Sequence, residues 1–214
     1  MSEIRIKTLV VGMVGTNCYL VYDNETKKAA VIDPGDDAAR IANMAVSLDL
    51  KPEAILLTHG HFDHMMAAKE LKEAWSVPIY ACEKEIPVLS DGNKSLVAGY
   101  YRDPYVITPD IMVKEGDEFT VAGFTWKVFE TPGHTIGSCC YYIEKEDVLF
   151  SGDTLFAGSY GRTDFPTGSG RQITESVRRL LSILPDDTMV YPGHMDATTI
   201  GFEKKYNPLS GALK

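Results

Sequence analysis

The amino-acid sequence predicts an α/β fold for the whole chain, residues 1–214, as a single domain. Short apolar runs bounded by Gly, Pro and Asp alternate with amphipathic segments of helical period, as in proteins that cover sheets with helices. The run Ala54–Leu57 is continuously apolar, which is typical of a strand buried on both faces. No linker-like or low-complexity stretch divides the chain, so we expect one core.

In the first half of the chain, strands and helices are expected to alternate. Turn-forming residues such as Asp33-Pro34-Gly35 end the apolar runs, and apolar residues recur at helical spacing between 37 and 48. In chain order, the predicted elements are strands at 9–14, 17–23 and 29–33, a helix at 37–48 capped by Asp36, a strand at 54–57, and a helix at 62–75.

The second half is richer in strands. We expect strands at 124–130, 139–145 and 147–153, an amphipathic helix at 172–184, and a last strand at 188–194 that opens into a loop. The segment 89–109, with its Gly and Tyr residues, shows no clear period and is expected to be a loop whose role the sequence does not reveal.

Composition and charge exclude several classes of function. The net charge is -9 and no Lys/Arg cluster exceeds a pair, whereas nucleic-acid binding needs a concentrated basic face. No stretch of about 18 apolar residues exists to span a bilayer, and the apolar run near the N-terminus indicates a strand rather than a signal peptide. The four cysteines form no CxxC pair, so reduced thiols and a cytoplasmic location are expected, without nucleic-acid or membrane partners. The oligomeric state stays open.

Three of the five histidines lie within THGHFDH, residues 58–64, directly after a predicted buried strand. His59 and His61 are two residues apart in an extended segment, so their imidazoles can point to the same side and share one metal ion. Asp63 and His64 begin the next helix and would face a neighbouring position, which indicates more than one ion. Imidazole and carboxylate donors suit zinc, iron or manganese.

The other two histidines follow Pro-Gly pairs, His134 in TPGHT and His194 in YPGH. Asp153 ends the apolar segment VLFSGD, where a carboxylate is costly unless it meets a cation or hydrogen-bond donors. Taken alone, each of these residues could be a hydrogen-bonded core residue or a cap. Together with HxHxDH, they predict one shared metal site.

The order HxHxDH, TPGHT, SGDT and PGH resembles the pattern of the metallo-β-lactamase superfamily. That resemblance implies an αββα sandwich, two packed mixed sheets flanked by helices with the metals at one edge. TNCYLV, VIDPG, GDTLFAGSYGRTD and TTIGFEKKYNP are similar to short bacterial glyoxalase II-like (hydroxyacylglutathione hydrolase-like) hydrolases. The resemblance assigns one metal to His59, His61 and His134, and the other to Asp63, His64 and His194, with Asp153 bridging them.

The resemblance implies a metal-dependent thioester hydrolase with two divalent metal ions, zinc first and iron or manganese as alternatives. A metal-bound hydroxide would attack the carbonyl of a thioester such as S-lactoylglutathione. Asp63 would bind its metal and also orient the hydroxide, a catalytic role. Two divalent ions leave a net positive charge in the site, so the expected partner is a small anionic thioester.

Arg162 stands where longer glyoxalase II enzymes carry a basic residue that contacts glutathione, so we predict it as a substrate-binding residue. A salt bridge to Asp164 is the alternative. Asp164 replaces an aromatic residue of those enzymes, and the chain ends at Lys214 without their C-terminal helical extension. The thiol carrier therefore stays open.

Two further functions remain open at this stage. The first is a mononuclear iron persulfide dioxygenase of the same fold, which would use His59, His134 and Asp153. The second is a binding module that metal stabilises and that turns nothing over. Retention of all seven donors favours the two-metal hydrolase, and the missing secretion signal disfavours an antibiotic-hydrolysing enzyme.

Overall fold

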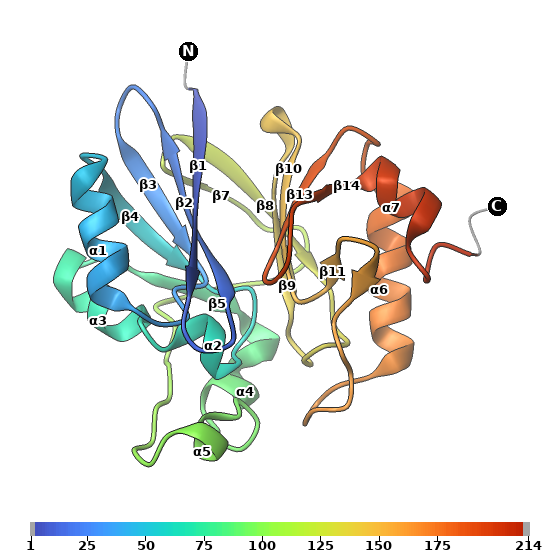
Figure 1. Cartoon of the computed structure of the whole chain (residues 1–214), viewed down its shortest axis with the longest axis horizontal. Coiled ribbons are helices and arrows are strands. Elements are labelled where there is room, and N and C mark those ends of the chain that lie inside the picture. Colours follow the sequence, from blue (N-terminus) through green and yellow to red (C-terminus); the bar gives the residue numbers. More distant parts are fainter. Residues whose placement is uncertain (1–2, 212–214) are drawn as a thin grey trace.

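The computed structural model describes residues 3–211, which form two six-stranded β-sheets packed face to face, with helices on both outer faces (Figure 1). The first half of the chain builds one sheet and its helices, and the second half builds the other. The expected αββα sandwich with two mixed sheets is confirmed.

The first sheet is antiparallel at its N-terminal edge and parallel elsewhere. The three N-terminal strands pair as antiparallel neighbours, whereas β3 to β6 run parallel. Helical crossovers make the first two parallel connections, because adjacent parallel strands cannot be joined by a tight turn. The order is β1 (Ile4–Val11), β2 (Thr16–Asp23), β3 (Lys28–Ile32), β4 (Lys51–Leu56), β5 (Ile79–Cys82) and β6 (Ile111–Val113).

The second sheet is antiparallel except for the β10–β13 pair, which is parallel and is connected through helix α6. A small hairpin, β11 (Leu155–Phe156) and β12 (Ser159–Tyr160), follows β10. The order is β14 (Thr198–Thr199), β13 (Met189–Pro192), β10 (Val148–Gly152), β9 (Cys139–Ile143), β8 (Phe124–Glu130) and β7 (Glu118–Val121).

The helices lie outside the two sheets or at the ends of their strands. They are α1 (Ala38–Ser47), α2 (Phe62–Met65), α3 (Ala68–Trp75), α4 (Ile86–Leu89), α5 (Val97–Tyr100), α6 (Gly170–Ile183) and α7 (Ile200–Tyr206), with short 3-10 turns at Glu83–Glu85 and Glu144–Glu146. Within residues 3–211, no helix has both the length and the apolar character that a bilayer crossing demands.

Alternation along the strands produces three buried layers. In β2, Leu20 faces the α1 and α3 side, whereas Tyr19 and Val21 face the second sheet. Trp126 and Phe150 of the second sheet fill the space between the sheets. The outer face of the second sheet packs against α6 and α7. Because both faces of each sheet are covered, the ends of the strands are the places left for a site.

The predicted helix at 62–75 is wrong in one respect, because it is two helices, α2 and α3. The backbone N–H of Ala67 donates to the carbonyl of Pro34 at 3.0 Å, and that of Met66 also reaches the carbonyl of Gly35 at 3.2 Å. These bonds draw the chain toward the turn after β3 and interrupt the helical ladder. The amphipathic period alone could not predict this tertiary competition.

Two smaller expectations also need correction. Helix α1 has Asp37, not Asp36, at its N-cap, and no side chain caps it; the Asp36 carboxylate instead accepts the N–H of Asp37 at 2.7 Å. The segment 89–109, expected to be a loop, contains the short helix α5.

Candidate metal centre

Two aligned strand ends position the first part of the site. Strands β3 and β4 are parallel neighbours in which Ile32 pairs with Leu56, so the residues that follow them emerge at the same edge. Asp33 follows β3, and Thr58 lies just beyond β4. The Thr58 backbone N–H donates to the Asp33 carboxylate at 2.8 Å, and the Thr58 hydroxyl donates to it at 2.6 Å. His59, His61, Asp63 and His64 therefore start from a fixed turn.

The second sheet supplies the remaining residues by the same device. Strands β10 and β13 are its parallel pair, and Gly152 aligns with Pro192. The Gly193 N–H donates to the Gly152 carbonyl at 2.8 Å, which brings Asp153 and His194 together at the edge that faces the first sheet. His134 comes from the loop after β8. Residues far apart in the sequence thus meet where the strands of both sheets end.

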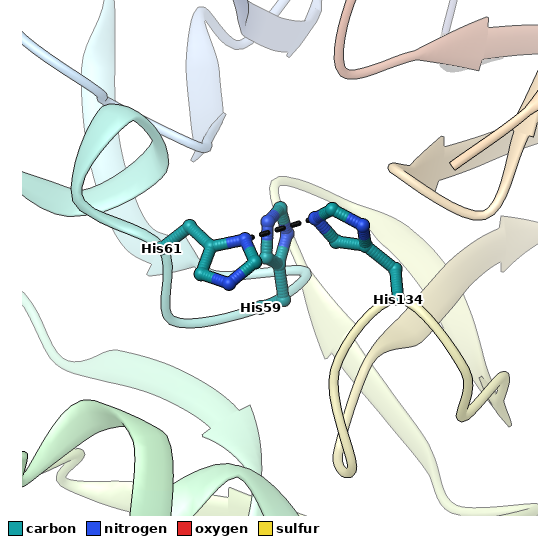
Figure 2. A group of neighbouring side chains, drawn as sticks. All are labelled: His59, His61 and His134. Atoms are coloured by element: carbon teal, nitrogen blue, oxygen red, sulfur yellow. Dashed lines mark hydrogen bonds between the residues drawn. The ribbon is translucent and has the colours of Figure 1, made fainter. Parts of the chain in front are cut away.

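His59, His61 and His134 form the first group of donors, and one ligand atom of each lies within 4.8 Å of the others. Figure 2 shows the three imidazoles converging, two from the turn after β4 and one from the opposite sheet. His61 Nδ1 and His134 Nε2 are 2.9 Å apart. This group matches the first predicted ligand set.

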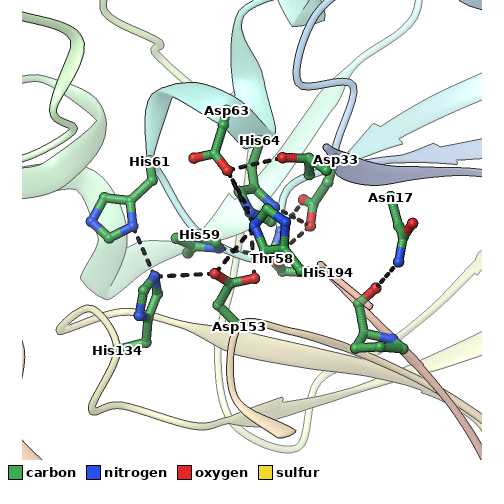
Figure 3. A network of polar contacts seen from close by, with 12 residues as sticks. Asn17, Asp33, Thr58, His59, His61, Asp63, His64, His134, Asp153 and His194 are labelled. Carbon is green, nitrogen blue, oxygen red and sulfur yellow. Dashed lines mark hydrogen bonds and ion pairs between the residues drawn. The ribbon is translucent and has the colours of Figure 1, made fainter. Parts of the chain in front are cut away.

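Asp63, His64 and His194 form the second group. The Asp63 carboxylate lies 3.5 Å from His64 Nε2 and 3.2 Å from His194 Nε2. Asp153 lies between the two groups, 3.4 Å from His64, 3.5 Å from His134 and 3.6 Å from His194 (Figure 3). The structure therefore brings all seven predicted residues together, and Asp153 contacts histidines of both groups.

Hydrogen bonds orient two of the rings so that Nε2 faces the centre. His134 Nδ1 donates to the carbonyl of Arg162 at 2.7 Å, and His64 Nδ1 donates to Asp33 at 2.9 Å. In a neutral imidazole, a proton on Nδ1 leaves the lone pair on Nε2. Partners of this kind fix the tautomer of metal-binding histidines.

Asp33 acts on both groups. Besides its bond to His64, it accepts the Thr58 hydroxyl, whose oxygen lies 3.2 Å from His59 Nδ1 and can accept the proton of that ring. Asp33, His59 and His64 also lie close enough to share an ion. The two Asp33 oxygens already accept three hydrogen bonds, so we assign Asp33 to positioning rather than to metal binding.

Buried polar atoms without partners test whether metal ions fit. Across residues 3–211, six buried side-chain nitrogen or oxygen atoms lack a hydrogen bond, and four belong to residues of this cluster: His59 Nε2, His61 Nε2, His64 Nε2 and Asp153 Oδ1. His61 turns Nδ1 rather than Nε2 toward His134, so the other three atoms carry the argument. A buried polar atom that has neither a hydrogen-bond partner nor a metal ion beside it destabilises the folded protein. Gly193 packs so tightly that a Cβ there would collide with the Asp153 carboxylate. The donor set, its crowding and its unpaired atoms fit divalent metal ions.

The electrostatics of the cluster also fit bound metal ions. Burial lowers the pKa of His64, but the carboxylates of Asp63, Asp153 and Asp33 outweigh burial and raise that pKa to about 10. Burial and the neighbouring histidines hold the pKa of His59 well below its usual value. The carboxylates of the cluster therefore attract positive charge, while the His59 ring stays neutral and can act as a metal ligand, so metal ions would replace protons there.

Strand β2 also positions the centre, through contacts that the sequence did not predict. The Asn17 side chain donates to the carbonyls of Pro192 and Met195, at 3.0 and 2.9 Å, and so holds the loop that carries His194. The Thr16 hydroxyl donates to the Asp63 carboxylate at 2.9 Å. Residues 16–19 thus connect the two sheets at the site.

Glu85 is a second positioning residue that sequence reasoning missed. Its buried carboxylate accepts the Gly60 N–H at 2.8 Å, between His59 and His61, and also the Thr135 hydroxyl at 2.9 Å and the Gly137 N–H at 2.8 Å. One carboxylate therefore links the two loops that carry the first histidine group. Burial raises the pKa of Glu85 to about 7, although the three donors act to lower it. No local pattern around Glu85 indicates this role.

We expect Glu85→Gln to destabilise the metal-free protein by about 2 kcal/mol, because the amide NH₂ would face a donor and leave it unpaired. Metal affinity should fall about tenfold as the two loops shift. Urea unfolding and chelator competition measure the two effects. Glu175→Gln is the matched control, since Glu175 is exposed on α6 and pairs only with Arg171 among the described residues. Equal behaviour of the two variants would contradict the role of Glu85.

A cleft of about 360 Å³ opens onto the centre, and five of the seven predicted ligands line it: His61, Asp63, His134, Asp153 and His194. Arg162 also lines this cleft, as a substrate-binding residue should. Its guanidinium, however, forms two 2.6 Å hydrogen bonds with the Asp164 carboxylate. The structure thus contains the alternative salt bridge, and the binding role of Arg162 stays a prediction.

Fold and site together define a metal-binding αββα protein whose centre opens to small molecules. The chain belongs to the metallo-beta-lactamase superfamily, whose family model matches residues 11–194. Membership supports a metal-dependent, hydrolase-type enzyme.

Several relatives cover nearly the whole chain. Hydroxyacylglutathione hydrolase GloC of Haemophilus influenzae is 37% identical over 207 residues, covering 95% of this chain and 97% of its own. BLEG-1 B3 metallo-beta-lactamase, known from a crystal structure, is 38% identical with a TM-score of 0.90, and the match covers 96% of this chain and 99% of that one. TTHA1623, known from a crystal structure in a di-iron-bound form, is 35% identical with a TM-score of 0.83, and the match covers 94% of this chain and 98% of that one.

Proposed function

We propose that this protein is a dinuclear metal-dependent hydrolase that cleaves a small thioester such as S-lactoylglutathione. The observation that carries the proposal is the pair of donor groups that share Asp153 at the floor of one cleft. The similarity to a hydroxyacylglutathione hydrolase supports the thioester as substrate class.

Two divalent ions are the proposed cofactors. The first would be held by His59, His61 and His134, and the second by Asp63, His64 and His194. Asp153 would contribute to both sites. Zinc is proposed first because histidine and carboxylate donors suit it, and the di-iron form of a relative keeps iron as the alternative. The chemistry that such ions supply when bound is activation of water and polarisation of a carbonyl oxygen.

The residues of the chain position the reaction. Burial raises the pKa of Asp63, but His64 and the bonds from His194 and Thr16 outweigh burial and hold it well below its usual range. Asp63 is therefore a carboxylate at neutral pH and can accept a hydrogen bond from the attacking water. Addition of that water to the thioester carbonyl and loss of the thiolate would give a carboxylic acid and a thiol.

The test combines metal analysis with turnover on one preparation. We expect close to two metal ions per chain by elemental analysis and hydrolysis of S-lactoylglutathione that needs no oxygen. Chelator treatment should abolish turnover, and reloading with zinc, iron or manganese separately should identify the metal that restores it.

Two outcomes would redirect the assignment. One iron per chain, no thioester cleavage and oxygen uptake with a persulfide would identify the dioxygenase instead. Rapid hydrolysis of a β-lactam without thioester cleavage would identify a β-lactamase, the activity for which BLEG-1 B3 metallo-beta-lactamase is named. Bound metal without turnover of any of these compounds would leave the non-catalytic binding module.

A further inference from the structure

The cleft above the metal centre has an apolar wall. Apart from the five ligands, its lining is mostly aliphatic and aromatic, and includes Val14, Phe62, Leu96, Tyr100, Phe156 and Phe165. Ligand sites of this kind bind the apolar part of a molecule against such a wall and use a few polar groups to orient it. The wall is continuous with the ligands, so whatever group occupies it belongs to the molecule that reacts.

The segment 89–109 builds one side of this wall. The Tyr100 ring stacks on Phe62 with 4.2 Å between centroids, and Tyr101 packs against Phe62 at 6.0 Å. The segment is fixed to helix α2, because the Phe62 N–H donates to the Ser95 carbonyl at 2.9 Å and the Tyr105 hydroxyl donates to the Met65 carbonyl at 2.9 Å. Tyr100 is nevertheless 56% exposed, so its ring presents unburied apolar surface at the cleft.

The cleft offers little positive charge for an anionic group. Among the described lining residues, Arg162 is the one Lys or Arg. Its guanidinium pairs with both oxygens of Asp164 and lies 4.0 Å from the centroid of the Phe165 ring. A substrate carboxylate would have to displace a carboxylate only two residues away along the same chain. The pair is therefore close to neutral toward a ligand.

We propose that this site selects thioesters whose non-reacting part is uncharged and apolar, with Tyr100, held by its stacking on the buried Phe62, as the specificity-determining residue. The inference rests on the proposed thioester hydrolase function and narrows its substrate class. It also revises the expectation of an anionic substrate, because the positive charge of bound metal ions acts at the reacting carbonyl and not along the wall. A glutathione thioester would then be a poor substrate compared with an uncharged one.

The experiment uses the metal-loaded protein and two sets of thioesters. S-lactoylglutathione and S-lactoyl-N-acetylcysteamine share the acyl group, and their thiols differ in charge and in size. We expect kcat/KM to be at least about tenfold higher for the uncharged thioester. For acetyl, butyryl and hexanoyl thioesters of N-acetylcysteamine, kcat/KM should rise up to about fourfold for each methylene that the wall buries.

Variants separate the wall from general effects. Tyr100→Ala should lower the hexanoyl-to-acetyl ratio of kcat/KM about fivefold, whereas Tyr100→Phe should keep it, because the ring and not the hydroxyl makes the contact. Tyr206→Ala is the matched control, since Tyr206 is 65% exposed on α7 and does not line the cleft. Asp164→Asn should free Arg162 and shift the selectivity several-fold toward the glutathione thioester.

The outcomes distinguish the two proposals. Tenfold preference for S-lactoylglutathione, or a flat acyl series in the unmodified protein, would overturn the inference and leave the thioester hydrolase standing. No cleavage of any thioester by protein with two bound metals would overturn the proposed function itself, and the inference with it.

Discussion

Asp153→Asn is expected to lower thioester turnover about a thousandfold, the largest loss from a single substitution in this site. The Asp153 carboxylate lies within 3.6 Å of histidines of both donor groups, His64, His134 and His194. An amide of nearly the same shape removes the negative charge and one acceptor at the junction of the two groups. Such a loss of preorganised charge has effects of this size in other active sites. Metal content should fall below two per chain, as elemental analysis would show.

Asp153→Glu separates charge from fit. Gly193 packs so closely against the Asp153 carboxylate that a single added Cβ on that glycine would collide with it. An extra methylene on the carboxylate therefore has no room, and we expect Asp153→Glu to lose most of the turnover despite its charge. Asp187→Asn, at an exposed turn position, is the matched control and should keep full activity. Wild-type turnover and metal content in Asp153→Asn would refute the central position of Asp153.

The sequence was most informative where several donors lie close together in the chain. HxHxDH needs no tertiary information, because an extended segment followed by a helix places its side chains by local geometry alone. His134, His194 and Asp153 could be grouped with it because each stands in a turn or at a strand end, where a polar residue needs a partner. The structure brings these residues together at one edge of the two sheets (Figure 3).

The residues that position the donors were harder to predict. Asp33 ends an apolar strand just as Asp153 does, so the same argument could have predicted it, but it stands without nearby histidines in the sequence. Glu85 lies in the charged segment EKE, which resembles a solvated turn. Only the tertiary fold places its carboxylate between the loops of Gly60 and Gly137.

Asp33→Asn is expected to weaken both metal sites without removing a metal ligand. The carboxylate of Asp33 accepts from the Thr58 N–H, the Thr58 hydroxyl and His64 Nδ1. An asparagine keeps one of the two oxygens and presents an NH₂ in place of the other. If the NH₂ replaces Oδ1, the buried backbone N–H of Thr58 loses its partner. If it replaces Oδ2, the Thr58 hydroxyl loses its acceptor and the ring proton of His64 must move to Nε2, which removes the lone pair directed at the centre.

Either arrangement should lower the free energy of unfolding of the metal-free protein by about 3 kcal/mol, since buried donors are left unpaired. Metal affinity should fall 10- to 100-fold, the usual effect of losing a partner behind a ligand, and chelator competition measures it for each ion. Thr58→Val separates the two groups, because it removes the hydroxyl near His59 and keeps the bond between Asp33 and His64. We expect Thr58→Val to weaken the binding of one metal ion, and Asp33→Asn to weaken the binding of both. If Asp33→Asn weakened only one ion, Asp33 would not couple the two donor groups through Thr58.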